Sequence, residues 1–306
     1  MANIDFGRDI IVKENEPLWK HSSLRIGGNA QYVLFPKTQE ELIFALNTCI
    51  NGNISYKIIG KASNILFDDL GFEGVIIVTD KLNSVEYTYK NDVVYVKAAC
   101  GKMITELASE TGKKHSLSGL EFAYGIPGTL GGAVYMNAGA YGGEMSDVVV
   151  ETEVYNTKTG QLMKIDFDKH DFSYRHSVFQ ERDEFVILSS CLKLSVGDAE
   201  HIYEIMTKNM SSRKEKQPLE YPNAGSTFKR PGENIYVGKL IEELGLKGCV
   251  SGGAQVSEKH AGFIINRGGA SSSDVLSLIN SIKSAVYDKH GIELESEIIY
   301  IPYKEI

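Results

Sequence analysis

The sequence has few of the features that mark secreted or membrane proteins. Its 306 residues include four cysteines, which lie far apart and form no CxxC pair. A disulfide framework is therefore not expected, and free thiols fit a reducing compartment. The longest apolar stretches, such as residues 75–78, are far too short to cross a bilayer. Residues 1–7 contain Asp5 and no apolar run, so we expect no signal peptide and a soluble, cytoplasmic protein.

An excess of positive charge is also absent. The chain has 32 Lys and Arg against 40 Asp and Glu, and its formal net charge is −8. General nucleic-acid binding depends on basic patches that neutralise phosphates, so we expect neither a nucleic-acid nor a membrane partner. His260 lacks metal-ligand spacing with any other His, and no metal site is expected. His260 is interpreted as structural or close to a site.

Local patterns predict a mixed chain of two or three domains, with boundaries near residues 75 and 200. Five helices are predicted. The first follows Thr38, the second covers 104–111 and stops at Gly112, and the third begins near 199 after Asp198. The fourth covers 237–244, and the fifth runs from Ser271 to Gly291. Predicted strands cover 56–60, 74–78, 85–89, 93–99, 148–156, 161–165, 185–194 and 292–301.

Glycine is concentrated in one segment. Eight of the 25 residues at 119–143 are Gly, where average usage gives about two. Glycine lets the backbone approach a ligand closely, and successive N–H groups can form an anion nest. The segment has neither the P-loop Lys-Ser/Thr nor a Rossmann G-x-G-x-x-G, so a dinucleotide here would bind in another way. Tight packing of a glycine-rich turn explains the composition equally well.

A second candidate loop follows the predicted strand at 56–60. It reads GKASNIL at residues 60–66 and offers Ser and Asn side chains together with backbone donors. A plain Asx turn is the simpler interpretation of this loop alone. Two such loops separated by strands favour a long cofactor with a pyrophosphate.

Seven motifs stand in an order that resembles the UDP-N-acetylenolpyruvoylglucosamine reductase family, also called UDP-N-acetylmuramate dehydrogenases. They are HSSLRIGG at 21–28, GKASNIL at 60–66, GIPGTLGGAVYMNAGAYGGE at 125–144, YRHSVF at 174–179, AGSTFKRP at 224–231, KHAGFIIN at 259–266 and LESE at 294–297. The resemblance covers nearly the whole chain. It implies an α+β fold, with a two-part FAD-binding domain of the vanillyl-alcohol-oxidase type and a C-terminal α+β substrate domain.

The resemblance divides the chain into 1–74 and 75–199 as the two FAD-binding subdomains. Residues 200–306 form the substrate domain, whose final strand returns to the active site. The implied reaction uses FAD and NADPH to reduce the enolpyruvyl group of UDP-N-acetylenolpyruvoylglucosamine to a lactyl ether. The product is UDP-N-acetylmuramate for peptidoglycan synthesis. We expect a monomer whose partner is this small-molecule substrate.

The resemblance also assigns three catalytic residues. Arg175 matches the arginine that binds the substrate carboxylate, and its fork suits a carboxylate bidentately. Ser226 matches the proton donor to the α-carbon. Glu297 matches the acid partner; held protonated, it could donate a hydrogen bond to the enolate. Taken singly, these residues also fit a surface arginine, a turn serine and a solvated glutamate. Glu295 shares a strand face with Glu297, and only the family motif selects the second.

Binding residues follow the same motifs. Tyr174, Lys216 and Arg230 are the substrate-binding candidates, although Tyr174 also fits a packing role, and many members have Asn in place of Arg230. Arg213 and Lys216 could meet phosphates or form a solvated helix end. The cofactor-binding candidates are Gly60, Lys61, Ala62, Ser63, Asn64, Ile65, Ile126, Pro127, Gly128, Thr129, Gly131, Gly132, Ala133, Asn137, Gly139 and Arg213.

Two further points follow from the resemblance. Only 50 residues separate Arg175 from Ser226, so the chain belongs to the shorter form without the tyrosine-lid insertion, and other residues must cover the substrate. The competing functions are a sugar or alcohol oxidase with the same FAD domain, and a non-catalytic nucleotide-binding module.

Overall fold

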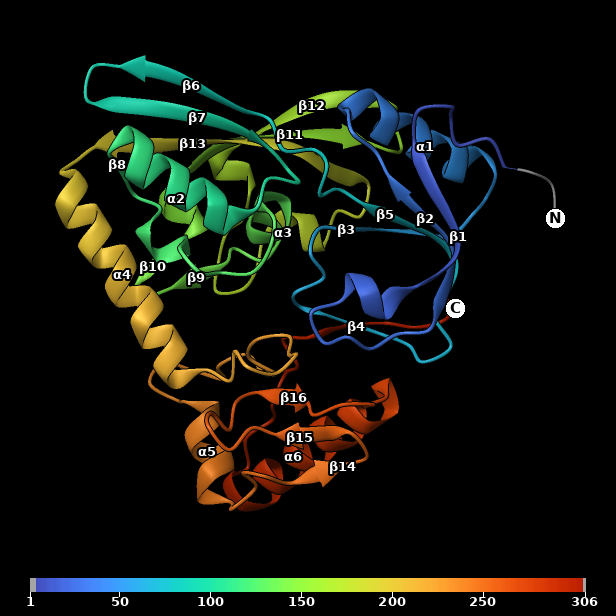
Figure 1. Cartoon of the computed structure of the whole chain (residues 1–306), viewed down its shortest axis with the longest axis vertical. Helices are drawn as coiled ribbons and strands as arrows, with labels where there is room; N and C mark the ends of the chain where they lie inside the picture. The colour runs from blue at the N-terminus through green and yellow to red at the C-terminus, as the bar shows by residue number, and fades with distance from the viewer. Residues whose placement is uncertain (1–3, 305–306) are drawn as a thin grey trace. The chain divides into compact units, whose positions relative to one another are not determined.

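The structure, a computed structural model, describes residues 4–304. The chain forms two compact units, and each unit combines segments that are separate in sequence (Figure 1). The first unit comprises the segment ending at Val12, Val33–Lys61 and Ile76–Ser212. The second comprises Lys13–Tyr32, Ala62–Val75 and the segment that begins at Arg213. Within residues 4–304, no helix is both long and apolar enough to span a bilayer.

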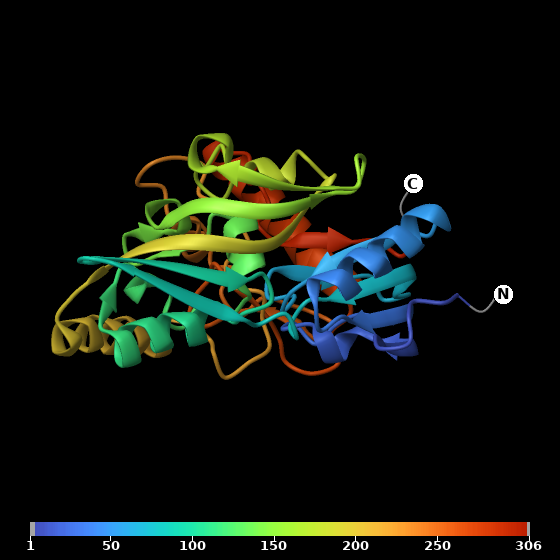
Figure 2. The same ribbon diagram turned by 90° about the horizontal axis from the view of Figure 1, so that it is seen from above.

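An antiparallel sheet dominates the first unit. Its long strands run side by side in the order β12-β11-β13-β7-β6, and the short β8 pairs with β13 (Figures 1 and 2). The strands are β6 (Val85–Lys90), β7 (Val93–Ala99), β8 (Leu117–Ser118), β11 (Val149–Asn156), β12 (Gln161–Asp166) and β13 (Phe185–Val196). The strands predicted at 85–89 and 93–99 form one hairpin, and those predicted at 148–156 and 161–165 form a second, with turns at 91–92 and 157–160.

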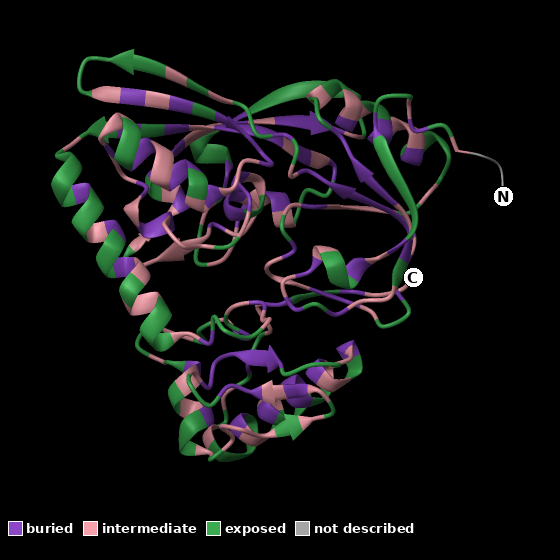
Figure 3. Cartoon of the chain, viewed as in Figure 1, coloured by how far each residue is buried: buried purple, intermediate pink, exposed green. Residues whose placement is uncertain are grey.

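The core of the first unit lies between this sheet and two helices. Along β7, buried and more exposed residues alternate as a half-buried strand requires (Figure 3). Val94, Val96 and Leu192 from the sheet join Leu107 and Leu130 from the helices in one buried cluster. The helices are α2 (Ile104–His115) and α3 (Leu130–Tyr135), and the short strands β9 (Gly139–Ala140) and β10 (Gly143–Glu144) follow them.

Helix starts occur where local capping predicts them. The Thr38 hydroxyl accepts the Glu41 N–H at 3.2 Å at the start of α1 (Gln39–Asn51). The Asp198 carboxylate accepts the His201 N–H at 2.8 Å at the start of α4 (Ala199–Lys216). Such bonds satisfy N–H groups that have no partner inside the helix.

A four-stranded sheet has the order β1-β2-β5-β3. Its strands are β1 (Ile11–Pro17), β2 (Asn29–Phe35), β3 (Tyr56–Ile59) and β5 (Phe72–Val78). The predicted strands at 56–60 and 74–78 are confirmed as β3 and β5. Residues 74–78 of β5 are all buried, which explains their continuous apolar run.

The second unit is built around α6 (Ser272–His290). Its predicted capping is confirmed: Ser271 and Asp274 form a capping box, and Gly291 ends the helix in the left-handed conformation at φ +65°. Val275, Ile279 and Ile282 face the buried cluster of this unit. The other elements are α5 (Val237–Glu243), the sheet β14-β15-β16 (Val250–Ser251, Ala254–Val256, Ile264–Asn266) and the parallel pair β17 (Ile299–Ile301) and β4 (Ile65–Phe67).

Two predicted element ends are wrong. The helix expected to stop at Gly112 continues to His115 and ends at Ser116, with φ +53°. Gly112 instead provides a close contact with α4, because a Cβ there would lie 2.9 Å from the Met206 sulfur. The strand expected over 292–301 is regular only over Ile299–Ile301, since the residues before it bond to separate partners, as described below.

Candidate functional site

The two predicted cofactor loops meet in the first unit. Gly60 follows β3 and lies against Thr129, the N-cap of α3. A Cβ added to Gly60 would lie 2.1 Å from the Thr129 hydroxyl oxygen. Only glycine allows this approach, so Gly60 joins two segments that are 69 residues apart in sequence.

The backbone beyond Gly60 has the form of an anion nest. Ala62 has φ +45°, a left-handed conformation that is uncommon for alanine. Among the described residues, the N–H groups of Lys61, Ala62 and Ser63 donate no hydrogen bond, whereas the Ala62 carbonyl accepts bonds from Ser23. Successive backbone donors around a left-handed residue suit a pyrophosphate. The residues present therefore fit the phosphate part of a dinucleotide cofactor.

The start of α3 does not offer such donors. Leu130 N–H donates to Lys102 O at 2.8 Å and Gly131 N–H to Cys100 O at 2.8 Å. A Cβ on Gly131 would lie 2.9 Å from the Cys100 Cβ. Tight packing therefore accounts for Gly131, while its role toward the cofactor stays a prediction. Burial raises the pKa of the Cys100 thiol to about 12, so this cysteine packs as a neutral group.

The other predicted cofactor residues differ in exposure. Gly132 and Pro127 are exposed, and Gly128 O accepts the Ile104 N–H at 3.0 Å. Ala133 is buried in the core of the first unit, and Ile126 packs against that core. Ile65 begins β4 in the second unit.

Gly60→Ala is expected to lower both thermal stability and FAD content. The new methyl group would overlap Thr129, and such overpacking costs about 1–3 kcal/mol. We expect a melting temperature several degrees lower, measured by scanning calorimetry, and less than half of the FAD content by absorbance. The double variant Gly60→Ala/Thr129→Ala removes the two nearest atoms and should recover part of the loss, the remainder reflecting the lost N-cap of α3. An unchanged single variant would contradict the close contact.

Arg175 lies at the tip of a tight turn in the first unit. Ser173 and His176 exchange backbone hydrogen bonds of 3.3 and 3.1 Å, and Arg175 between them has φ +57°. Its Nη2 donates to Gly139 O at 3.1 Å, and its guanidinium lies 5.1 Å from the ring centre of Tyr174. The buried Asn137 donates from Nδ2 to Ser173 O at 3.0 Å. Asn137 and Gly139, predicted as cofactor residues, thus contact the turn of Arg175.

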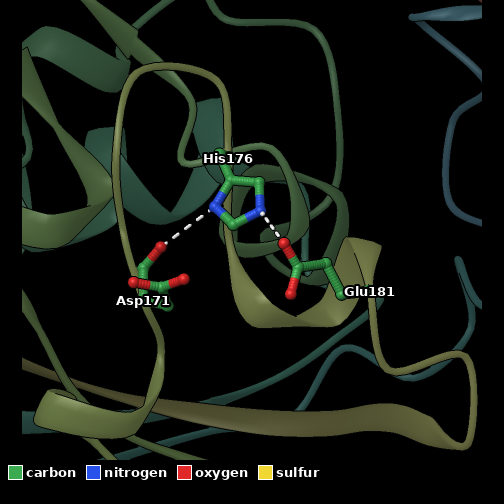
Figure 4. Close-up of side chains that lie close together, drawn as sticks. All are labelled: Asp171, His176 and Glu181. Carbon is green, nitrogen blue, oxygen red and sulfur yellow. Dashed lines mark hydrogen bonds and ion pairs between the residues drawn. The ribbon is translucent and has the colours of Figure 1, made fainter.

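A cluster that the sequence did not predict adjoins this turn. His176 lies between Asp171 and Glu181 (Figure 4). One atom of each residue that is able to bind a metal lies within 4.8 Å of the other two. The His176 Nε2 is 3.1 Å from Glu181 Oε1. The Gln180 side chain donates to Arg175 O at 3.0 Å. His176 and Gln180 stand within or directly after the YRHSVF motif, and that position is the only sequence signal for them.

Ser226 lies in an exposed loop of the second unit, after Gly225 at φ +78°. The next residue anchors this loop firmly. The buried Thr227 donates its N–H to Gly262 O at 2.8 Å, and its hydroxyl accepts the Ile264 N–H at 3.2 Å. The serine hydroxyl is therefore presented to solvent by a fixed backbone.

Glu297 is joined to the same loop. Its N–H donates to Thr227 O at 2.9 Å, and its carbonyl accepts from Asn64 Nδ2 at 2.9 Å. Asn64 O in turn accepts the Ile299 N–H at 3.0 Å. The structure thus brings Ser226 and Glu297 into neighbouring segments, and Asn64 fixes the backbone at Glu297.

Glu295 has a different environment from Glu297. Its side chain is 71% exposed and pairs with Lys229 Nζ at 2.7 Å. An exposed pair of this kind contributes little to stability. Glu297 is half-buried, but both glutamates are joined to the Ser226 loop through their backbones, since Lys229 N–H donates to Glu295 O at 2.9 Å. The choice of Glu297 over Glu295 therefore stays a prediction of the family motif.

Most of the residues predicted to bind phosphate or substrate are exposed to solvent. Lys216 is exposed, and Arg213 half-buried, in the last turn of α4. Arg230 is exposed, and its guanidinium lies 6.0 Å from the ring centre of Tyr236. Tyr174 is 40% exposed. His260 accepts the Gly262 N–H at 3.1 Å and is interpreted as structural; burial lowers its pKa, which favours the neutral ring.

Sequence comparisons identify the family. An FAD binding domain model matches residues 30–166, and the model "UDP-N-acetylenolpyruvoylglucosamine reductase, C-terminal domain" matches residues 217–301. The UDP-N-acetylenolpyruvoylglucosamine reductase of Petrotoga mobilis is 43% identical over 290 residues, which cover 94% of this chain and 93% of the relative. That of Syntrophomonas wolfei is 46% identical over 288 residues and covers 94% of each chain. The chain belongs to the UDP-N-acetylenolpyruvoylglucosamine reductase family.

The comparison of structures agrees with this membership. The crystal structure of the Thermus caldophilus UDP-N-acetylenolpyruvylglucosamine reductase has a TM-score of 0.77 and 30% identity, and the match covers 96% of this chain and 99% of that one. As a UDP-N-acetylenolpyruvoylglucosamine reductase family member, the chain is an FAD-binding oxidoreductase of peptidoglycan synthesis. The α+β fold class, with an FAD-binding and a C-terminal reductase domain, is confirmed.

Proposed function

We propose that the protein reduces the enolpyruvyl group of UDP-N-acetylenolpyruvoylglucosamine to the lactyl ether of UDP-N-acetylmuramate, with NADPH as the reductant. The observation that supports this most strongly is the hydrogen bond of 2.9 Å from Glu297 N–H to Thr227 O, which holds the acid beside the Ser226 loop. A proton donor and a carboxyl group are what the second half of such a reduction needs.

Each catalytic side chain has one role in this proposal. Arg175 binds the substrate carboxylate and offsets the negative charge that develops there, because its guanidinium stays charged and forms paired hydrogen bonds. The Ser226 hydroxyl gives its proton to the α-carbon. Glu297, in its protonated form, donates a hydrogen bond to the enolate oxygen. Tyr174, Lys216 and Arg230 are the proposed contacts to the rest of the UDP-sugar.

The flavin would be held by residues 60–65, 126–129 and 131–133, Asn137 and Gly139, with Arg213 as a further phosphate contact. When bound, FAD supplies the hydride that reduces the substrate double bond. The division into two FAD subdomains, 1–74 and 75–199, and a substrate domain, 200–306, belongs to the same proposal. The proposal also includes a cytoplasmic location, which the four free cysteines support, and a monomeric state.

An anaerobic titration tests the proposal. The purified protein, loaded with FAD, should lose its yellow colour with NADPH and regain it when enolpyruvyl-UDP-GlcNAc is added. UDP-GlcNAc, which lacks the enolpyruvyl group, is the matched ligand and should not restore the colour. Recovery of the colour with oxygen alone would indicate an oxidase. A colourless protein that does not take up FAD would indicate a nucleotide-binding module.

A further inference from the structure

The turn that carries Arg175 is attached to the C-terminal end of α3 and to the residues directly after it. The buried Asn137 donates from Nδ2 to Ser173 O at 3.0 Å, before the arginine. The Ser177 hydroxyl donates to Tyr135 O at 2.7 Å, after the arginine. Polar side chains therefore join both ends of the turn to the same part of the first unit.

The Gln180 side chain makes the attachment that reaches Arg175 itself. Its Nε2 donates to Arg175 O at 3.0 Å and to Tyr135 O at 2.9 Å. An amide nitrogen of this kind carries two N–H groups, and these two carbonyl oxygens accept from both of them. Gln180 is half-buried, so removal of its amide takes a donor from two carbonyl groups that water reaches only in part.

The backbone of Arg175 is one that depends on such support. Its φ of +57° is left-handed, which brings the Cβ of an L-residue close to the following carbonyl oxygen. Residues other than glycine keep this conformation where surrounding contacts enforce it. The backbone bonds between Ser173 and His176 close the turn on itself, whereas Gln180 connects it to α3. The guanidinium is held from the same side, because Arg175 Nη2 donates to Gly139 O at 3.1 Å.

We infer that Gln180 is a positioning residue for Arg175, whose side-chain amide bridges the Arg175 and Tyr135 carbonyl oxygens and so holds the guanidinium where it binds the substrate carboxylate. The inference rests on the proposed role of Arg175. Because α3 carries predicted cofactor residues, the bridge fixes the arginine relative to the cofactor segment. Loss of the amide should weaken the binding of the carboxylate-bearing substrate and leave flavin reduction by NADPH unaffected.

Two substitutions of Gln180 separate the bridge from side-chain volume. Gln180→Met is similar in length but has no N–H group, so the Kd of the FAD-loaded, oxidised protein for enolpyruvyl-UDP-GlcNAc should rise about tenfold. The Kd for UDP-GlcNAc, which lacks the carboxylate, and the rate of flavin reduction by NADPH should stay at wild-type values. Gln180→Lys offers three N–H donors on a long side chain and should recover most of the lost affinity.

The matched control is Gln255→Met in the second unit. Gln255 is also half-buried, and its Nε2 donates to Gly248 O at 3.1 Å. The same chemical change there should alter the Kd for neither ligand. Isothermal titration calorimetry without NADPH measures all of these constants, so the test needs no turnover.

The double variant Gln180→Met/Arg175→Ala decides whether Gln180 acts through Arg175. It should bind enolpyruvyl-UDP-GlcNAc no more weakly than Arg175→Ala alone, because residues that act as one unit do not have additive effects. Additive losses, an unchanged Kd in Gln180→Met, or an equal loss of affinity for UDP-GlcNAc would overturn the inference.

The ¹³Cα and ¹³Cβ resonances of Arg175 test the positioning without substrate, since they report its backbone conformation. Gln180→Met should shift them away from left-handed values, and Gln180→Lys should not. Resonances that Gln180→Met leaves in place would show that the amide does not hold the turn. If Arg175→Ala binds the enolpyruvyl substrate as tightly as the wild type, the proposed role of Arg175 fails, and the resonances still decide whether Gln180 positions the arginine.

Discussion

Ser226→Ala is expected to slow the oxidation of the reduced flavin by the enolpyruvyl substrate by about 10²–10⁴-fold, the usual contribution of a general acid. The change removes one hydroxyl group from an exposed loop residue. The bonds of Thr227 to Gly262 and Ile264 hold the loop backbone and are retained. Stability and flavin content should therefore stay at wild-type values. Stopped-flow absorbance measures the two half-reactions separately.

The reduction of the flavin by NADPH is the internal control for this variant, because it needs no proton at the substrate α-carbon. Ser281→Ala is the external control. Its hydroxyl only donates to Ser277 O within α6, at 2.9 Å, and its loss should leave both half-reactions intact. If Ser226→Ala slowed both half-reactions equally, or neither of them, Ser226 would not be the proton donor.

Glu297→Gln should slow the same half-reaction by about 10²-fold or more, the scale measured when one group that stabilises a developing oxyanion is removed. Glutamine offers only an amide N–H, a weaker donor to a developing enolate than the acidic O–H of a protonated carboxyl group, while the backbone bonds of residue 297 to Thr227 and Asn64 are kept. Rapid-mixing experiments with pre-reduced enzyme give this rate directly, and flavin reduction by NADPH should change little.

Glu295→Gln is the matched comparison, since it makes the same chemical change two residues away. Glu295 is largely exposed, and its carboxylate pairs with Lys229. Losing an exposed pair costs about 1 kcal/mol or less, so both half-reactions should proceed at close to the wild-type rate. If Glu295→Gln were the damaging change and Glu297→Gln the harmless one, the assignment of the acid would be reversed.

Local interactions made much of the fold predictable from sequence. The caps at Thr38, Asp198 and Ser271 lie where the sequence predicts them, because a cap depends on residues within one turn. The predicted end of α2 was wrong, because Gly112 packs closely against Met206, 94 residues later, and does not end the helix. The final strand is shorter than predicted because the residues before Ile299 bond to Thr227 and Asn64 instead of a regular neighbour.

The candidate site was predictable to a similar extent. Motif order predicted Arg175, Ser226 and Glu297, and only the family motif selected Glu297 over Glu295, because strand periodicity places both on one face. The His176 cluster could not be predicted, because it depends on left-handed backbone at Asp171 and Arg175, which neither residue type favours. The nest after Gly60 depends on Ala62 in the same way.

A crystal structure of the protein with FAD and enolpyruvyl-UDP-GlcNAc bound tests the central claim most directly. The claim is that one arginine, one serine hydroxyl and one carboxyl group act on the same enolpyruvyl group. We expect the Arg175 guanidinium on the substrate carboxylate, and the Ser226 hydroxyl and Glu297 carboxyl within hydrogen-bonding reach of the reacting carbon and enolate oxygen, next to the flavin ring. A complex in which any of these three side chains faces away from the enolpyruvyl group would contradict the claim.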